Sequence, residues 1–188
     1  MTSTFDLDAF IGHCREAVTG EAEPWLAVRE VLEEALSDRA AIAAALPVDR
    51  AELVPLYTGE DVTVVKVVWA PLMTFPPHDH LTWACNGLYA GTEHNTLFAL
   101  DDERLRPTGE FVIEEGGIGV LDADAIHAVR NPDRRALSAA IHVYGGDFPS
   151  LPRTNWMGDP PRRRPASIEA TKQMFAAAND RLDDEDRR

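Results

Sequence analysis

The feature that most constrains the fold is a change in the spacing of apolar residues near residue 50. From Phe5 to about Leu46, apolar residues recur every three or four positions in an alanine-rich stretch, which predicts two or three helices. From Val54 to about Val143, the chain carries short runs of β-branched and aromatic residues separated by Gly, Asp and Pro. We therefore expect N-terminal helices followed by an antiparallel β sandwich or barrel.

The length of the chain limits how many domains it can form. Its 188 residues, 45% of them hydrophobic, suffice for one buried core but are too few for two domains of ordinary size. We expect a single domain, 1–188, with a helical segment over 1–48, a barrel over 52–148 and a C-terminal extension over 149–188. The extension is predicted to hold a short helix near Ile168–Ala178 and a charged tail.

Composition narrows the partners and the compartment. A formal net charge of -14 argues against nucleic acid and anionic membrane as partners, because both attract positive surfaces. A small molecule is the expected partner of a monomer or homodimer. Two well-separated cysteines, an N-terminus without a signal-peptide pattern and the absence of a long apolar run favour a cytoplasmic location.

Histidines cluster in three places within the β-rich region. His78 and His80 are separated by one residue, so in a strand both imidazoles lie on one face of the sheet. His127 follows 47 residues after His80, and His142 precedes Tyr144 in a later β-rich run. Three imidazoles hold a metal ion while leaving coordination positions free, whereas structural zinc usually takes four closed ligands. The spacing predicts an open metal site.

The residues around His127 resemble the second signature motif of the cupins, which are small double-stranded β-helix (jelly-roll) barrels. Gly116, His127 and Asn131 stand at the motif's spacings, while Asp122 and Asp124 replace its Pro and Gly. The resemblance implies a mainly β cupin barrel, to which the N-terminal helices and a C-terminal helix would be added.

The first cupin motif is matched except at its carboxylate. Three positions agree with it: His78, His80 and Gly91. Leu72 stands where the motif usually has Gly, and the position of the Glu ligand falls on Ala84 or Cys85, depending on the spacer. The resemblance therefore implies a metal centre of three histidines, His78, His80 and His127, without the fourth ligand of ordinary cupins.

Loss of that Glu narrows the resemblance to the thiol dioxygenases, above all the bacterial mercaptopropionate dioxygenase type, which hold ferrous iron with three histidines. The run His78–Trp83, followed by Gly and by Glu93, is similar to the bacterial members. The family's Ser-x-His-x-Tyr triad reads Ala140-x-His142-x-Tyr144 here, so its serine is missing. Over Leu56–Arg153, the resemblance implies Fe(II) as cofactor, with Tyr144 and His142 as catalytic residues.

Four further positions bear on the substrate. Gly59 follows Tyr57-Thr58, where mammalian-type cysteine dioxygenases have an Arg, whereas Arg153 lies nine residues after Tyr144, as a carboxylate-binding Arg does in the bacterial enzymes. The resemblance thus implies oxidation of a thiol carboxylic acid, such as 3-mercaptopropionate, by O2 to a sulfinate. Trp83 is expected in the barrel core or pocket wall. Cys85 resembles the Cys that crosslinks to the active-site Tyr in mammalian-type enzymes. The candidate substrate-site residues are therefore Arg153, Trp83 and Cys85.

Other readings stay open. The chain could be a cupin that uses another divalent metal for non-oxidative chemistry or cleaves C–C bonds with O2, or a small-molecule-binding cupin without catalysis. His142 and Tyr144 could be a buried polar pair. Glu93 could be a metal ligand, although its position beside Gly91 favours a carboxylate that anchors a loop. His13 and His94 are interpreted as surface residues.

Overall fold

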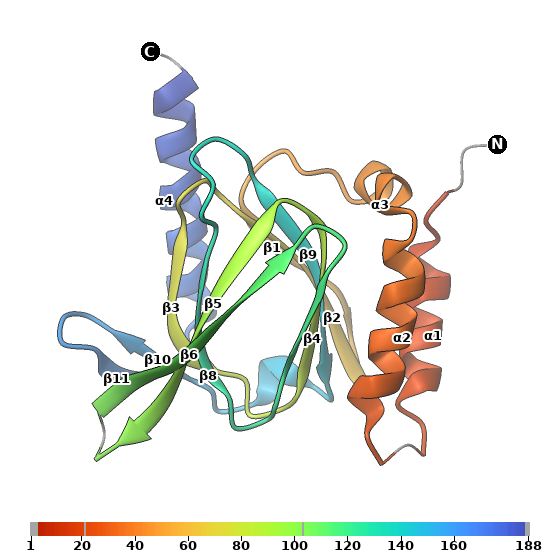
Figure 1. Cartoon of the computed structure of the whole chain (residues 1–188), viewed down its shortest axis with the longest axis horizontal. Coiled ribbons are helices and arrows are strands. Elements are labelled where there is room, and N and C mark those ends of the chain that lie inside the picture. Colours follow the sequence, from red (N-terminus) through yellow and green to blue (C-terminus); the bar gives the residue numbers. More distant parts are fainter. Residues whose placement is uncertain (1–3, 21, 103, 187–188) are drawn as a thin grey trace.

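The computed structural model describes residues 4–20, 22–102 and 104–186, and four helices flank a β barrel (Figure 1). The helices are α1 (Leu7–Ala17), α2 (Pro24–Leu36), α3 (Arg39–Ala45) and α4 (Ile168–Asp186). The strands, in chain order, are β1 (Glu52–Thr58), β2 (Val62–Trp69), β3 (Thr74–Asp79), β4 (Ala84–Ala90), β5 (Thr92–Asp101), β6 (Arg104–Glu114), β7 (Ile118–Leu121), β8 (Ile126–Arg130), β9 (Ser138–Gly145), β10 (Thr154–Met157) and β11 (Arg162–Pro165).

The N-terminal helices begin where the sequence supplies caps. Asp6 accepts a hydrogen bond from the Ala9 backbone at 3.0 Å, and Asp38 does the same for Ala41 at the start of α3. Pro24 begins α2, a position where its missing N–H costs nothing. The prediction of two or three helices before residue 48 is confirmed.

The strand pairing is that of a double-stranded β-helix. Strand β2 pairs with β9, β3 with β8, β4 with β7 and β5 with β6, all antiparallel, as in one long hairpin coiled on itself. The coiling gives two facing sheets, ordered β1-β2-β9-β4-β7 and β11-β10-β3-β8-β5-β6. This pairing confirms the mainly β cupin barrel.

The central strands of the five-stranded sheet, β2, β4 and β9, are buried on both faces. Alternate residues of β2 point to opposite sides: Val64 and Val68 pack with α1–α3, whereas Val65 and Trp69 point into the barrel. In Figure 1, α1–α3 stand on one side of the barrel and α4 on the other. Helical cover on the outer face explains why β2 is a nearly continuous apolar run instead of an alternating one.

The C-terminal extension contains more structure than the sequence suggests. Strands β10 and β11 extend the second sheet beyond residue 148, and Asn155 of β10 lies opposite His78 of β3. Helix α4 runs to Asp186, past the predicted end near Ala178, while residues 187–188 of the charged tail lie outside the described residues. Asn179 holds α4 by exchanging two hydrogen bonds with the Ala51 backbone, at 2.8 and 2.9 Å.

No helix within the described part of the chain is both long and apolar enough to cross a membrane.

Candidate metal centre

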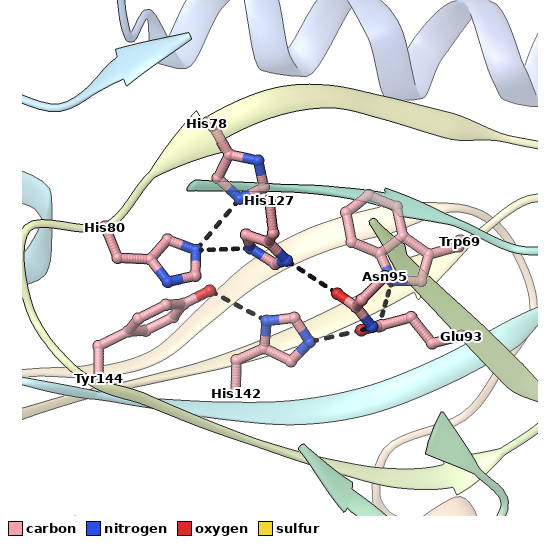
Figure 2. A network of polar contacts seen from close by, with 8 residues as sticks. All are labelled: Trp69, His78, His80, Glu93, Asn95, His127, His142 and Tyr144. Atoms are coloured by element: carbon pink, nitrogen blue, oxygen red, sulfur yellow. Dashed lines mark hydrogen bonds and ion pairs between the residues drawn. The ribbon is translucent and has the colours of Figure 1, made fainter. Parts of the chain in front are cut away.

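Three histidines meet inside the barrel, as the spacing predicts. His78 lies on β3 directly opposite His127 on β8, and His80 follows the end of β3. The Nε2 atom of His80 lies 3.1 Å from Nε2 of His78 and 3.2 Å from Nε2 of His127 (Figure 2). All three side chains are buried, and they form a group that could hold a metal ion.

The outer ring nitrogens decide which atoms these histidines can offer. Nδ1 of His78 donates to the Pro76 carbonyl at 3.0 Å, and Nδ1 of His127 faces Oδ1 of Asn95 at 2.8 Å. Burial lowers the pKa of His78 to about 4 and lowers the pKa values of His80 and His127 well below their ordinary value, with neighbouring histidines adding to the shifts. Neutral imidazoles whose Nε2 lone pairs converge in a buried space fit a divalent metal ion.

His142 and Tyr144 face these histidines from the opposite sheet. Both point inward from β9, and Nδ1 of His142 lies 2.9 Å from the Tyr144 hydroxyl oxygen. The Tyr144 ring meets the His80 ring edge to face, with their centroids 5.1 Å apart. Burial raises the pKa of Tyr144, so the side chain is a neutral phenol at physiological pH. The pair can therefore offer a hydroxyl beside the metal centre.

Glu93 lies on strand β5, inside the barrel, so its interpretation as a loop anchor is wrong. It is fully buried and does not belong to the three-histidine group. Its carboxylate accepts hydrogen bonds from Trp69 Nε1 at 2.9 Å and Asn95 Nδ2 at 3.0 Å, and Oε2 lies 3.8 Å from Nε2 of His142. Asn95 was not among the predicted site residues. Two inward polar residues alternating on one strand are the signal that could have found it.

Arg153 reaches the edge of the same site. Its guanidinium carbon lies 3.8 Å from the centre of the Phe148 ring, and Phe148 stacks on Tyr144 at 3.8 Å. Asp79 fixes the adjoining backbone by accepting a 2.6 Å hydrogen bond from the Thr154 N–H. Arg153 Nε is buried and has no hydrogen-bond partner among the described residues. A cationic donor in this state suits an anionic ligand. Phe148 was missed by the sequence analysis.

The structure does not bring Cys85 to the histidines. Its cross-strand neighbour on β9 is Val143, while Tyr144 lies opposite Ala84. Because neighbouring strand residues point to opposite faces, Cys85 packs against the helices, where its thiol contacts the Trp25 carbonyl at 3.4 Å. Burial raises the pKa of Cys85 to about 12. This packing gives no support to the predicted place of Cys85 in the substrate site or to a crosslink with Tyr144.

Trp83 also lies on the helical side of the sheet. It packs against the cluster that α1–α3 form on β2, β4 and β9. It lines a surface cavity of about 540 Å³ together with Val18 and Pro24, whereas no metal-centre histidine lines that cavity. Trp83 directly precedes β4 and is thus part of the layer between helices and barrel, and this packing gives no support to its predicted place in the substrate-binding set.

Comparisons with known proteins find distant structural similarity to several solved structures. No protein-family model matches the chain. The chain is similar to an uncharacterized conserved protein with a double-stranded β-helix domain from Klebsiella pneumoniae, at 11% identity and a TM-score of 0.47, covering 56% of this chain and 79% of that one. An RmlC-like cupin family protein from Methanocaldococcus jannaschii gives 16% identity and a TM-score of 0.44, covering 54% and 84%. An oxalate oxidase gives 20% identity and a TM-score of 0.39, covering 48% and 44%. By its own strand pairing, the chain has the cupin double-stranded β-helix fold, with a buried three-histidine group able to bind a metal ion.

Proposed function

We propose that this protein is an Fe(II)-dependent thiol dioxygenase that oxidises a small thiol carboxylic acid, such as 3-mercaptopropionate or a relative, to its sulfinate. The reaction balances as R–SH plus O2 giving R–SO2H, so both oxygen atoms enter the product and no separate reductant is needed. The observation that carries the proposal is the position of Arg153. Its buried guanidinium N–H, which has no hydrogen-bond partner among the described residues, lies at the edge of a site that also contains a phenol and three histidines able to hold a metal ion.

The three histidines would hold the iron. Because all three are neutral, the ion would keep its full positive charge and favour an anionic thiolate as a further ligand. Bound iron would supply the redox chemistry that joins the thiol sulfur and O2.

The remaining residues bind and orient the substrate. Arg153 has the planar fork that pairs with a carboxylate in a bidentate manner, and its backbone is held through Thr154 by Asp79. The Tyr144 hydroxyl, held by Nδ1 of His142, offers a polar contact beside the substrate position. Phe148 covers Tyr144 and lies edge to face on His80, with centroids 5.7 Å apart, which helps to exclude water.

The test is oxygen uptake by protein loaded anaerobically with Fe(II), using 3-mercaptopropionate, mercaptosuccinate, cysteine and cysteamine. We expect uptake of one O2 per thiol consumed, a sulfinate detected by mass, and faster turnover of the thiol acids than of cysteamine, which has no carboxylate. Zn(II)-loaded protein is the control and should be inactive. Absence of uptake with every thiol would refute the proposal, and thiol binding without uptake would favour a binding cupin.

A further inference from the structure

Glu93 is the one acidic side chain of the described barrel interior that contacts His142, and both of its oxygens are engaged. Oε1 accepts from Asn95, and Oε2 accepts from Trp69 and faces His142. Burial would raise the pKa of Glu93, but its contacts with His142, Asn95 and Trp69 outweigh burial and hold that pKa below its ordinary value. A fully buried carboxylate is costly unless it is paired in this way, so the charge of Glu93 constrains how its partners place their hydrogens.

On one side, the carboxylate orders the hydrogens of a metal-binding histidine. An ionised carboxylate only accepts hydrogen bonds, so Asn95 must turn its NH2 group toward Glu93 and its Oδ1 toward His127 (Figure 2). Nδ1 of His127 must then carry the ring hydrogen. Nε2 of His127 keeps its lone pair directed at His78 and His80, as metal binding requires.

On the other side, the Glu93 carboxylate faces His142, which holds the Tyr144 hydroxyl. Nε2 of His142 has no hydrogen-bond partner among the described residues, and Oε2 of Glu93 lies 3.8 Å from it. A negative charge at that distance favours the tautomer with hydrogen on Nε2. Nδ1 of His142 is then left to interact with the Tyr144 hydroxyl. Ala140, two residues earlier on the same face of β9, has no polar side chain that could orient the His142 ring in place of Glu93.

We propose that Glu93 is a positioning residue that sets the hydrogens of two histidines at once: His127, through Asn95, for metal binding, and His142, directly, for holding Tyr144. A hydroxyl at the position of the Glu93 carboxylate could either donate or accept a hydrogen bond. An ionised carboxylate can only accept and so permits one arrangement of the imidazole hydrogens. The effect on the imidazole hydrogens is independent of the reaction. The effect on turnover rests on the proposed function.

The first experiment needs no reaction. Imidazole nitrogen NMR of the metal-free protein should show hydrogen on Nδ1 of His127 and on Nε2 of His142. In Glu93→Gln, whose amide can donate as well as accept, both signals should shift toward mixed tautomers, while Glu110→Gln, an exposed exchange on the neighbouring strand β6, should leave them unchanged. Hydrogen on Nδ1 of His142 in the unaltered protein would overturn the proposal, even if the Glu93 variant failed to fold.

The second experiment is a double-mutant cycle on the iron-loaded protein, with rates expressed per bound iron. Glu93→Gln should lower kcat about 10-fold or more with little change in KM, and should weaken iron affinity about 10- to 100-fold because an outer partner of His127 is disturbed. Combined with Tyr144→Phe, it should lower kcat no further than Tyr144→Phe alone, since both act through one hydroxyl. Additive losses would contradict the proposal. If no thiol is oxidised, the proposed function fails while the NMR result still decides the role of Glu93.

Discussion

At the scale of single residues, His80 differs from the other two histidines of the metal centre. Its Nδ1 atom is buried and has no hydrogen-bond partner among the described residues, whereas His78 and His127 each have one. Its Nε2 atom is the one that lies within 3.2 Å of both other Nε2 atoms. His80 is therefore held mainly by packing and by the ion that it would bind.

Changing His80 to Ala should abolish metal loading. Losing an outer partner of a metal ligand weakens binding about 10- to 100-fold, and losing the ligand itself should cost more. The measurement is metal content after anaerobic loading and desalting. His94→Ala is the matched control, because His94 is exposed on β5, as predicted. A His80 variant that kept its full metal content would remove His80 from the ligand set.

Replacing Tyr144 by Phe should lower turnover at least about 10-fold, because the site loses the hydroxyl that Nδ1 of His142 holds beside the metal position. Metal content should not change, because the hydroxyl contacts His142 and not the nitrogens that converge on the metal position. Steady-state oxygen uptake and metal analysis on the same sample provide the check. Loss of metal in this variant would mean that Tyr144 is structural.

Replacing Arg153 by Gln should discriminate between thiols. We expect kcat/KM for 3-mercaptopropionate to fall about 30- to 100-fold, because the carboxylate loses a charged partner, while the value for cysteamine should change little. Arg164→Gln, an exposed change on β11, is the control. An equal loss for both thiols would show that Arg153 does not recognise the carboxylate.

At the scale of elements, strand alternation decides which predicted residues share a site. His142 and Tyr144 are two apart on β9 and both point inward, as the sequence indicates. Cys85 is predicted from its distance to His80 alone, and a shift of one residue along β4 turns it to the helices. A strand position is therefore predictable to within one residue from a motif, and one residue is enough to move a side chain to the other face.

Two turns near the histidine motifs show that the surroundings of a left-handed residue decide whether it must be glycine. Leu72 stands where cupins usually have Gly, yet its backbone keeps the left-handed conformation, with φ of 57°, and its side chain is exposed. Gly91 has φ of 76°, and a Cβ there would lie 2.8 Å from the Leu137 carbonyl oxygen and 2.9 Å from Cα of Ser138. Leu72 has room for its side chain, whereas Gly91 meets backbone.

Gly91→Ala should therefore lower the free energy of unfolding by about 2 kcal/mol or more, because the left-handed backbone and the contact with backbone atoms act together. Urea unfolding gives the comparison. Gly109→Ala on β6 is the control: a Cβ there meets no atom within 4 Å, so the change should stay within about 0.5 kcal/mol. Equal effects of the two changes would show that the tight turn at Gly91 is not needed.

At the scale of the whole molecule, the buried histidines tie stability to pH. Burial lowers the pKa of His78 from 6.5 to about 4 and shifts His80 and His127 in the same direction. Above pH 6.5, these groups are neutral in the folded and unfolded states. As the pH falls from there toward 4, the unfolded chain takes up protons that the folded chain does not, so the free energy of unfolding falls.

For the metal-free protein, we expect each such histidine to contribute about 1 kcal/mol to the loss of stability between about pH 7 and pH 5.5. Urea unfolding at the two pH values measures the total. His78→Gln should remove about one histidine's share of that loss, whereas His94→Gln, which changes an exposed residue, should leave it unaltered. An unchanged pH dependence in His78→Gln would contradict the lowered pKa.

The sequence by itself determined the β barrel, the helices before it, and the histidines at 78, 80 and 127 as one group, because local period and short motif spacings encode them. Tertiary structure decided the rest. Phe148, Asn95 and the barrel position of Glu93 were not found from the sequence, because only the coiling of the long hairpin brings β5, β9 and the segment before β10 around one interior. Cys85 packs against α1–α3 and not into the barrel, because a spacing along the chain does not state which face of a sheet a side chain occupies, whereas the strand register does.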